Sequence, residues 1–287
     1  MLRNPQRGIH APLTNGLRRI RSDEMGALQL LRPGAITIFE DQLKDESFIS
    51  FLHHEASTEE LEVYCRLIPV EGPEPIVVAM RLVGLAKQYP WIRGWVPISE
   101  PNQWSRFSWP DISIWVDELY SHVTMQRRTN DVHFLLFFPP LAQDMGGEKD
   151  HRVGWEHLRR SIEHFLENGD GFSWYSYWHA MDHRRLTERE MPRWLFAALE
   201  DGDVRQKTLI VEAGRFYQEP LGIEGSYGDE IIERFGSRAR RMRSYSLAHA
   251  VTMWVLGSAV SDFQHQAWID EEGHRKDIID YIAQWGP

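Results

Sequence analysis

Two apolar segments of this 287-residue chain each lead directly to a glutamate. Trp95-Val96-Pro97-Ile98-Ser99 leads to Glu100, and Leu209-Ile210-Val211 leads to Glu212. The proline after Glu100 stops further strand pairing, and Gly214 permits a sharp change of direction after Glu212. If both segments are strands that end on the same side of a fold, their carboxylates share one pocket. A pair of carboxylates is the equipment that cleavage of a glycosidic bond requires.

The two carboxylates would have different roles in such a reaction. When the carboxyl groups lie roughly 5–5.5 Å apart, one attacks the anomeric carbon while the other protonates the leaving oxygen, and the sugar keeps its configuration. The nucleophile must stay ionised and the acid must keep its proton, which a neighbouring anion favours. The alternative interpretation is that both residues are ordinary surface or ion-paired glutamates.

Regularly alternating elements would position these residues. Short segments that are β-branched or almost continuously apolar predict parallel strands, at residues 8–12, 35–39, 61–70, 92–98, 132–138, 171–178, 208–211 and 248–256. Helical spacing, with Thr14 and Pro75 as start signals, predicts helices at residues 14–31, 45–54, 75–89, 111–124, 155–166, 191–199, 229–243 and 271–285.

Eight strands alternating with eight helices predict an α/β fold with a parallel sheet. A repeat of about 35 residues is typical of a closed (β/α)8 TIM barrel, so we expect one barrel domain over residues 1–287. The alternative is an open doubly wound sheet, but the glycine-rich phosphate turn typical of that fold does not follow the first strand. The active site of a barrel lies at the C-terminal ends of its strands, where we expect Glu100 and Glu212.

On these residues the chain resembles the retaining glycoside hydrolases of clan A. Those enzymes place an acid/base glutamate in an Asn-Glu-Pro motif on the fourth strand, and here the matching run is Ser99-Glu100-Pro101-Asn102. Their nucleophilic glutamate ends the seventh strand, where this chain has Val211-Glu212-Ala213-Gly214. The resemblance implies a glycosidase with Glu212 as nucleophile and Glu100 as acid/base, no cofactor, and a carbohydrate substrate.

Ser99 departs from the family motif, which has asparagine in its place. That asparagine contacts the 2-hydroxyl of the sugar, and a serine side chain is shorter. The substitution leaves open a weaker enzyme, a different sugar, or a barrel that binds carbohydrate without cleaving it. Asn102, directly after the proline, is a candidate replacement for the missing amide.

Further candidates for substrate binding lie at other predicted strand ends. Arg66 is a charge inside an apolar strand and needs a buried partner, either a catalytic carboxylate or Glu40 and Asp41 after the second strand. Tyr177 and His179 lie on one side of the sixth strand together with Tyr175, by alternation. Two tryptophans, Trp104 after the fourth strand and Trp254 in the eighth, are suited to stacking on a sugar. Core packing is the alternative interpretation for these aromatic residues.

Composition excludes several other classes of protein. A net charge of −10 argues against a nucleic-acid partner, because phosphate binding needs a basic surface. The single cysteine, Cys65, cannot form an internal disulfide or a thiolate cluster. No apolar run reaches membrane-spanning length and the first residues lack a signal peptide, so we expect no membrane contact and a cytoplasmic protein, or a secreted one if a leader was removed. The oligomeric state stays open.

Three polar clusters are given simpler interpretations. The acidic loop from Asp144 to His151 matches no calcium-loop spacing, and the histidines at 53, 54, 179 and 183 fit no zinc-protease motif, so we expect no metal. The basic cluster from Arg238 to Arg243 is interpreted as an exposed helix face. A metal-assisted barrel hydrolase stays as a further alternative to the glycosidase.

Overall fold

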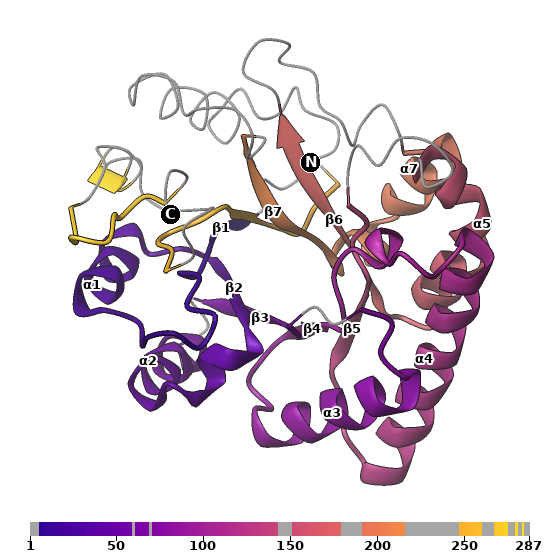
Figure 1. Ribbon diagram of the computed structural model, residues 1–287, viewed down its shortest axis with the longest axis horizontal. Coiled ribbons are helices and arrows are strands. Elements are labelled where there is room, and N and C mark those ends of the chain that lie inside the picture. Colours follow the sequence, from indigo (N-terminus) through magenta and orange to yellow (C-terminus); the bar gives the residue numbers. More distant parts are fainter. Residues whose placement is uncertain are drawn as a thin grey trace. The chain divides into compact units, whose positions relative to one another are not determined.

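The fold is a closed barrel of eight parallel strands with helices between them, as the computed structural model shows (Figure 1). The structure describes residues 6–58, 61–68, 71–142, 151–178, 191–215, 247–259, 267–274, 279, 280 and 283. The strands follow one another around the barrel in chain order, from β1 to β8. The prediction of a (β/α)8 TIM barrel is therefore confirmed.

The strands are short and mostly buried. They are β1 Gln6–His10, β2 Ala35–Phe39, β3 Glu62–Arg66, β4 Gly94–Val96, β5 Leu135–Phe138, β6 Gly171–Trp178, β7 Thr208–Arg215 and β8 Ala250–Met253. The predicted bounds of β2 and β6 are correct, because β-branched residues predominate in β2 and aromatic residues in β6. The seventh strand runs four residues beyond the predicted end at Val211.

The helices start and stop at local signals. They are α1 Ser22–Leu31, α2 Glu46–Ser57, α3 Pro75–Gln88, α4 Trp109–Asn130, α5 His151–Glu167, α7 Arg193–Leu199 and α8 Gly202–Arg205, with 3-10 turns η1 Glu40–Lys44 and η2 Pro101–Gln103. Pro75 opens α3, and a capping box between Ser108 and Asp111 opens α4. The predicted helix over 229–243 lies outside the described residues, as does most of the one over 271–285.

Two compact units make up the described chain. The first contains β1, β2, α1, α2, β8 and most of β7. The second contains most of β3, all of β4 and β5, the helices from α3 to α8, and most of β6. In the second unit, α3 packs on α4 and α4 on α5, and Figure 1 shows these helices along the outer side of β4 and β5. The expectation of one domain over the whole chain stays a prediction.

The prediction that Thr14 caps the first helix is wrong, because α1 begins eight residues later, at Ser22. Carboxylates hold the intervening segment as a loop. Asp41 accepts hydrogen bonds from the Thr14 hydroxyl and the Gly16 N–H, at 3.1 and 2.8 Å. Glu24, which is fully buried, accepts two hydrogen bonds from Arg18, at 2.6 and 2.8 Å. The bond from Gly16 satisfies a loop N–H, and the others fix the side chains of Thr14 and Arg18, so the segment is held without a helix.

A partly buried ion pair fixes the end of α4 to the starts of two strands. Arg127 donates to both carboxylate oxygens of Asp170, at 2.8 and 2.9 Å, and to the carbonyl of Phe134. Asp170 also accepts the Leu136 N–H. Burial and the nearby Asp170 carboxylate raise the pKa of Tyr120 to about 12, so this tyrosine stays neutral.

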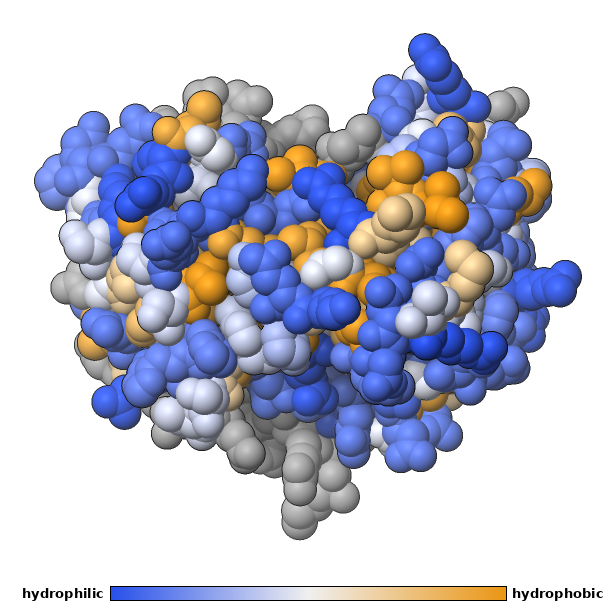
Figure 2. Space-filling view, turned by 90° about the horizontal axis from the view of Figure 1, so that it is seen from below, coloured by the Kyte–Doolittle hydropathy of each residue, from blue (hydrophilic) through white to orange (hydrophobic). Residues whose placement is uncertain are grey.

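On the surface, apolar residues are scattered among polar ones. Figure 2 shows small hydrophobic patches separated by hydrophilic residues on the face in view. Exposed apolar side chains include Ile76, Val77 and Met80 on α3 and Ile114 on α4. Within the described part of the chain, every helix is too short or too polar to cross a bilayer.

The stability of the fold depends on pH through Asp45, the N-cap of α2. Burial raises the pKa of this carboxyl, but hydrogen bonds from the Ser47 hydroxyl and from the N–H groups of Ile20 and Phe48 outweigh it, so the net pKa lies below the usual value. The folded pKa is depressed, so its stabilising contribution is complete above the unfolded pKa near 3.8 and is lost as the pH falls through the folded value.

We predict that Asp45→Ala lowers the free energy of unfolding at neutral pH by about 0.5–2 kcal/mol, the usual cost of losing an N-cap. Asp45→Asn is the matched control, because asparagine caps helices about as well but does not titrate in this range. Chemical denaturation between pH 3 and 7 should therefore show a smaller loss of stability at low pH for Asp45→Asn than for the unchanged chain. Parallel pH curves for the two proteins would contradict this account.

Candidate active site

Glu100 lies in the loop after β4, four residues beyond Val96, with an unusual backbone conformation. Its φ and ψ are 57° and 47°, the left-handed region that glycine prefers. A side chain in this region costs about 1 kcal/mol, and non-glycine residues there cluster at functional sites. The Glu100 N–H donates to the carbonyl of Pro140 at 2.8 Å, and Pro101 follows at the start of η2. The backbone around this carboxylate is thus tightly fixed.

Asn102 joins the loop after β4 to the loop after β5. Its Nδ2 donates to the Ala142 carbonyl at 3.0 Å, and its Oδ1 accepts the Ala142 N–H at 2.8 Å. The side chain is fully buried. The amide proposed to replace the missing asparagine is therefore engaged with backbone, and it positions the loop that carries Glu100.

Arg66, at the end of β3, is brought together with Ser99 and Tyr175. One nitrogen of its guanidinium, Nη2, donates to the Ser99 hydroxyl and to the Tyr175 hydroxyl, both at 2.8 Å. The guanidinium carbon lies 5.6 Å from the centre of the Tyr175 ring. Arg66 is 3% exposed, so it is buried as the sequence indicated. These two partners are hydroxyls, whereas the sequence analysis expected a carboxylate, either a catalytic one or Glu40 and Asp41.

The double donation from Arg66 determines what the two hydroxyls can do. A hydroxyl that accepts from Arg66 keeps its own hydrogen for another acceptor. Ser99 and Tyr175 therefore act as donors whose oxygens are held in place by a cation. An oxygen-rich ligand, or a carboxylate, is the chemical group that such a pair of donors can bind.

Trp104 packs into the structure and is not an open platform for a sugar. It is 4% exposed, and its ring lies edge-on to Trp115, with 4.9 Å between ring centres, and to Phe107, with 5.1 Å. For Trp104 the structure therefore favours packing in the core over stacking on a sugar. Its effect on the site is indirect, since it packs the loop after η2 onto α4.

Glu212 lies within β7, in the other compact unit, and is 6% exposed. The strand continues past it to Arg215. The neighbouring carbonyls are held by β8, because Thr252 Oγ1 donates to Val211 at 2.6 Å and the Trp254 N–H donates to Ala213 at 3.0 Å. Because the bonds from Thr252 and Trp254 fix β7 on both sides of Glu212 in sequence, its buried carboxylate has little freedom to move.

Trp254 follows β8 and lies beside a histidine that the sequence analysis missed. Its ring is edge-on to that of His10, with 4.7 Å between centres, and His10 also contacts Phe39 at 5.1 Å. His10 is fully buried at the end of β1, with Nδ1 2.9 Å from the Ala11 carbonyl. Trp254 is 5% exposed and packs with Leu13 and Val255.

Tyr175, on the sixth strand, is brought together with Arg66. Alternation along the sequence is the reason for the prediction that Tyr177 lies on the same side. The side chain of Tyr177 and the whole of His179 lie outside the described residues, so both stay predictions. The buried charge of Arg66, together with this alternation, was the signal that could have identified Tyr175.

One group of side chains has the geometry of a cation site. The ligand atoms of Asp270, Glu272 and His274 lie within 4.8 Å of one another. The group is at the surface, and an Asp270 oxygen is already 3.1 Å from Nδ1 of His274. Exposed acidic groups are common without a metal, so this group has no role in the chemistry considered below.

Comparison with known proteins supports the fold. No family model matches the sequence, and no curated protein matches it. The solved structure of XacCel5A matches with a TM-score of 0.63 at 10% identity, over 99% of this chain and 98% of that one. The β-glucuronidase of Parabacteroides merdae matches with a TM-score of 0.60 at 12% identity, and that of Ruminococcus gnavus in complex with uronic isofagomine with 0.58 at 10%.

The extent of these matches differs between the neighbours. This chain covers 37% of the Parabacteroides enzyme and 51% of the Ruminococcus enzyme, so it spans about half of these proteins or less. At such low identities the similarity shows a shared barrel fold.

We predict that Asn102→Ala lowers the free energy of unfolding by about 1–3 kcal/mol, because it leaves the buried N–H and carbonyl of Ala142 unsatisfied. Gln103→Ala is the control, since this exposed neighbour lies on the same turn. Urea unfolding monitored by tryptophan fluorescence measures both. Equal stability of the two variants would mean that the bonds to Ala142 do not hold the loop.

Proposed function

We propose that this chain is a retaining glycoside hydrolase, with Glu212 as the nucleophile and Glu100 as the acid/base. The observation that carries the proposal is Glu100 itself. In a (β/α)8 barrel, a non-glycine residue held in the left-handed region, on the loop after β4, bears the carboxylate. The catalytic side of such barrels is the side of the C-terminal strand ends.

The surroundings of the two carboxylates support different roles. Glu212 is buried on a strand, which suits a nucleophile that must attack from a fixed position. Glu100 is partly exposed and lies on a loop, which suits a group that exchanges a proton first with the leaving group and then with water. The proposal requires the two carboxyl groups to approach to roughly 5–5.5 Å.

The reaction would proceed in two displacements. Glu212 attacks the anomeric carbon while Glu100 gives its proton to the departing oxygen, which breaks the glycosidic bond and forms a glycosyl ester on Glu212. Glu100, now a carboxylate, then takes a proton from water, whose oxygen attacks the same carbon and frees Glu212. Ser99 and Tyr175, held by Arg66, would donate hydrogen bonds to substrate oxygens or to a carboxylate of the site. Tyr177, His179 and Trp254 stay candidates for further sugar contacts.

The second candidate is a barrel that binds carbohydrate without cleaving it. One observation favours it: neither Ser99 nor Asn102 offers an amide to a sugar, because serine has none and the amide of Asn102 is engaged with Ala142. A binding barrel would keep the pocket but need no acid or nucleophile. Activity measurements on carboxylate variants therefore separate the two functions.

We predict that the chain hydrolyses at least one aryl glycoside in a panel of sugars, and that Glu212→Gln and Glu100→Gln each lower kcat by a factor of about 10² or more. Glu118→Gln, on the exposed side of α4, is the matched control and should leave kcat unchanged. Azide should restore turnover to Glu212→Ala, because a small anion can occupy the space of the missing carboxylate. Full activity in either glutamine variant would remove that residue from the mechanism.

Glu100→Gly offers a sharper test, because stability and activity should move in opposite directions. Glycine relieves the left-handed backbone, so we predict a gain of up to about 1 kcal/mol in unfolding free energy together with loss of turnover. Asp131→Gly is the matched control. Asp131 ends α4 with a similar φ of 51°, so its glycine variant should gain stability and keep its activity. Loss of stability in Glu100→Gly would show that the side chain is there to stabilise the fold.

A further inference from the structure

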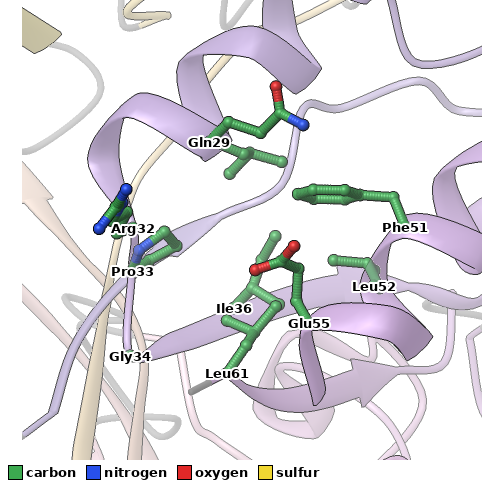
Figure 3. Close-up of a pocket in the computed structure, with 10 residues that line it drawn as sticks. Gln29, Arg32, Pro33, Gly34, Ile36, Phe51, Leu52, Glu55 and Leu61 are labelled. Carbon is green, nitrogen blue, oxygen red and sulfur yellow. The ribbon is translucent and has the colours of Figure 1, made fainter. Parts of the chain in front are cut away.

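A cavity lies between α1 and α2, on the outer side of β2 (Figure 3). Its volume is about 760 Å³, within the range of ligand sites in proteins. It is lined by the end of α1, the link to β2 at Pro33 and Gly34, the second half of α2, and Leu61 before β3. These segments lead into the N-terminal ends of β2 and β3, the opposite end of the strands from a barrel active site.

One face of each helix forms a wall of this cavity. Gln29 lies in the last turn of α1, and Arg32 is the C-cap residue that follows this helix. Phe51 and Glu55 are four residues apart on α2, so they lie on one face of that helix. Figure 3 shows the Phe51 ring and the Glu55 carboxylate pointing into the space between the walls. The floor is apolar and contains four buried side chains, namely Leu28, Ile36, Leu52 and Leu61.

The polar side chains of the walls have no protein partner. Gln29, Arg32 and Glu55 make no side-chain hydrogen bond or ion pair with any residue that the structure describes. Arg32 and Glu55 line the same cavity with opposite charges, yet they do not meet. Elsewhere in the described chain, the helices α3 and α4 pack closely against each other. The cavity thus presents the guanidinium of Arg32, which only donates hydrogen bonds, the carboxylate of Glu55, which only accepts them, and the amide of Gln29, which can do both.

We propose that this pocket binds a neutral saccharide. A sugar has hydroxyls that donate to Glu55 and accept from Arg32 and Gln29, and an apolar C–H face that packs on the Phe51 ring. A simple fatty chain would leave all three polar groups unsatisfied, and an apolar amine would satisfy Glu55 alone. The site is separate from the proposed catalytic residues, and the inference does not depend on the proposed function.

The test uses the whole chain and cellotriose, a neutral trisaccharide, as the probe. Methyl resonances of Leu28, Ile36, Leu52 and Leu61 report on this pocket specifically, so binding at a catalytic site does not interfere. We expect cellotriose to shift these resonances with a Kd of about 1 mM, and Gln29→Ala and Glu55→Ala to weaken binding by about tenfold or more. His54→Ala, an exposed position on α2, should change the Kd by less than about twofold.

Alanine is the best helix former, so the two wall variants should fold like the unchanged chain. The proposal is overturned if cellotriose does not move the four methyl resonances, or if it binds Gln29→Ala and Glu55→Ala as tightly as it binds the unchanged chain. A response to hexylamine without one to cellotriose would assign the pocket to an apolar cation and would also overturn it. Each of these results is independent of whether the chain hydrolyses glycosides.

Discussion

Parallel pairing of the strands is the constraint on which this structure depends. A parallel neighbour can be reached only by a crossover, so a helix or a loop must return the chain to the start of each new strand. In consequence the C-terminal ends of the strands gather on one side, and residues far apart in sequence meet there. The contact of Arg66 with Ser99 and Tyr175 shows this, because it joins residues at or near the ends of β3, β4 and β6. The fold thus builds a polar site from short pieces of apolar strand.

Hydrogen bonds to backbone groups then fix the loops that follow the strands. The N–H of Glu100 is tied to Pro140, and the amide of Asn102 is tied to Ala142, so the loops after β4 and β5 hold each other. The left-handed conformation of Glu100 costs free energy, and these bonds maintain it. A carboxylate fixed in this way is already oriented before a ligand arrives, which is what a proton-transferring group needs. Nearby Trp104 adds packing against α4 and not a ligand surface.

The sequence predicted the barrel because its signals are periodic and repeated, and errors at single boundaries do not change the count of strands. It placed β2 and β6 correctly, where β-branched residues predominate in β2 and aromatic residues in β6. It could not predict that Thr14 lies in a loop, because the carboxylates that hold this loop, Asp41 among them, are distant in sequence. The side-chain directions of Asn102 and Trp104 were unpredictable for the same reason. The buried charge of Arg66 was readable from sequence, but its partners required the three-dimensional arrangement.

In the proposed mechanism, Glu212 forms a covalent bond with the sugar, and Glu100 donates a proton to the leaving oxygen and later accepts one from water. Incubation with a 2-deoxy-2-fluoro glycoside that carries a good leaving group, followed by mass spectrometry of the digested chain, tests it most directly, because the fluorine slows release of the intermediate. The account predicts one added glycosyl group, on the peptide that contains Glu212. The Glu100→Gln variant should form the same adduct when the leaving group departs without protonation. Turnover of the parent glycoside with no adduct, or with the adduct on another residue, would contradict it.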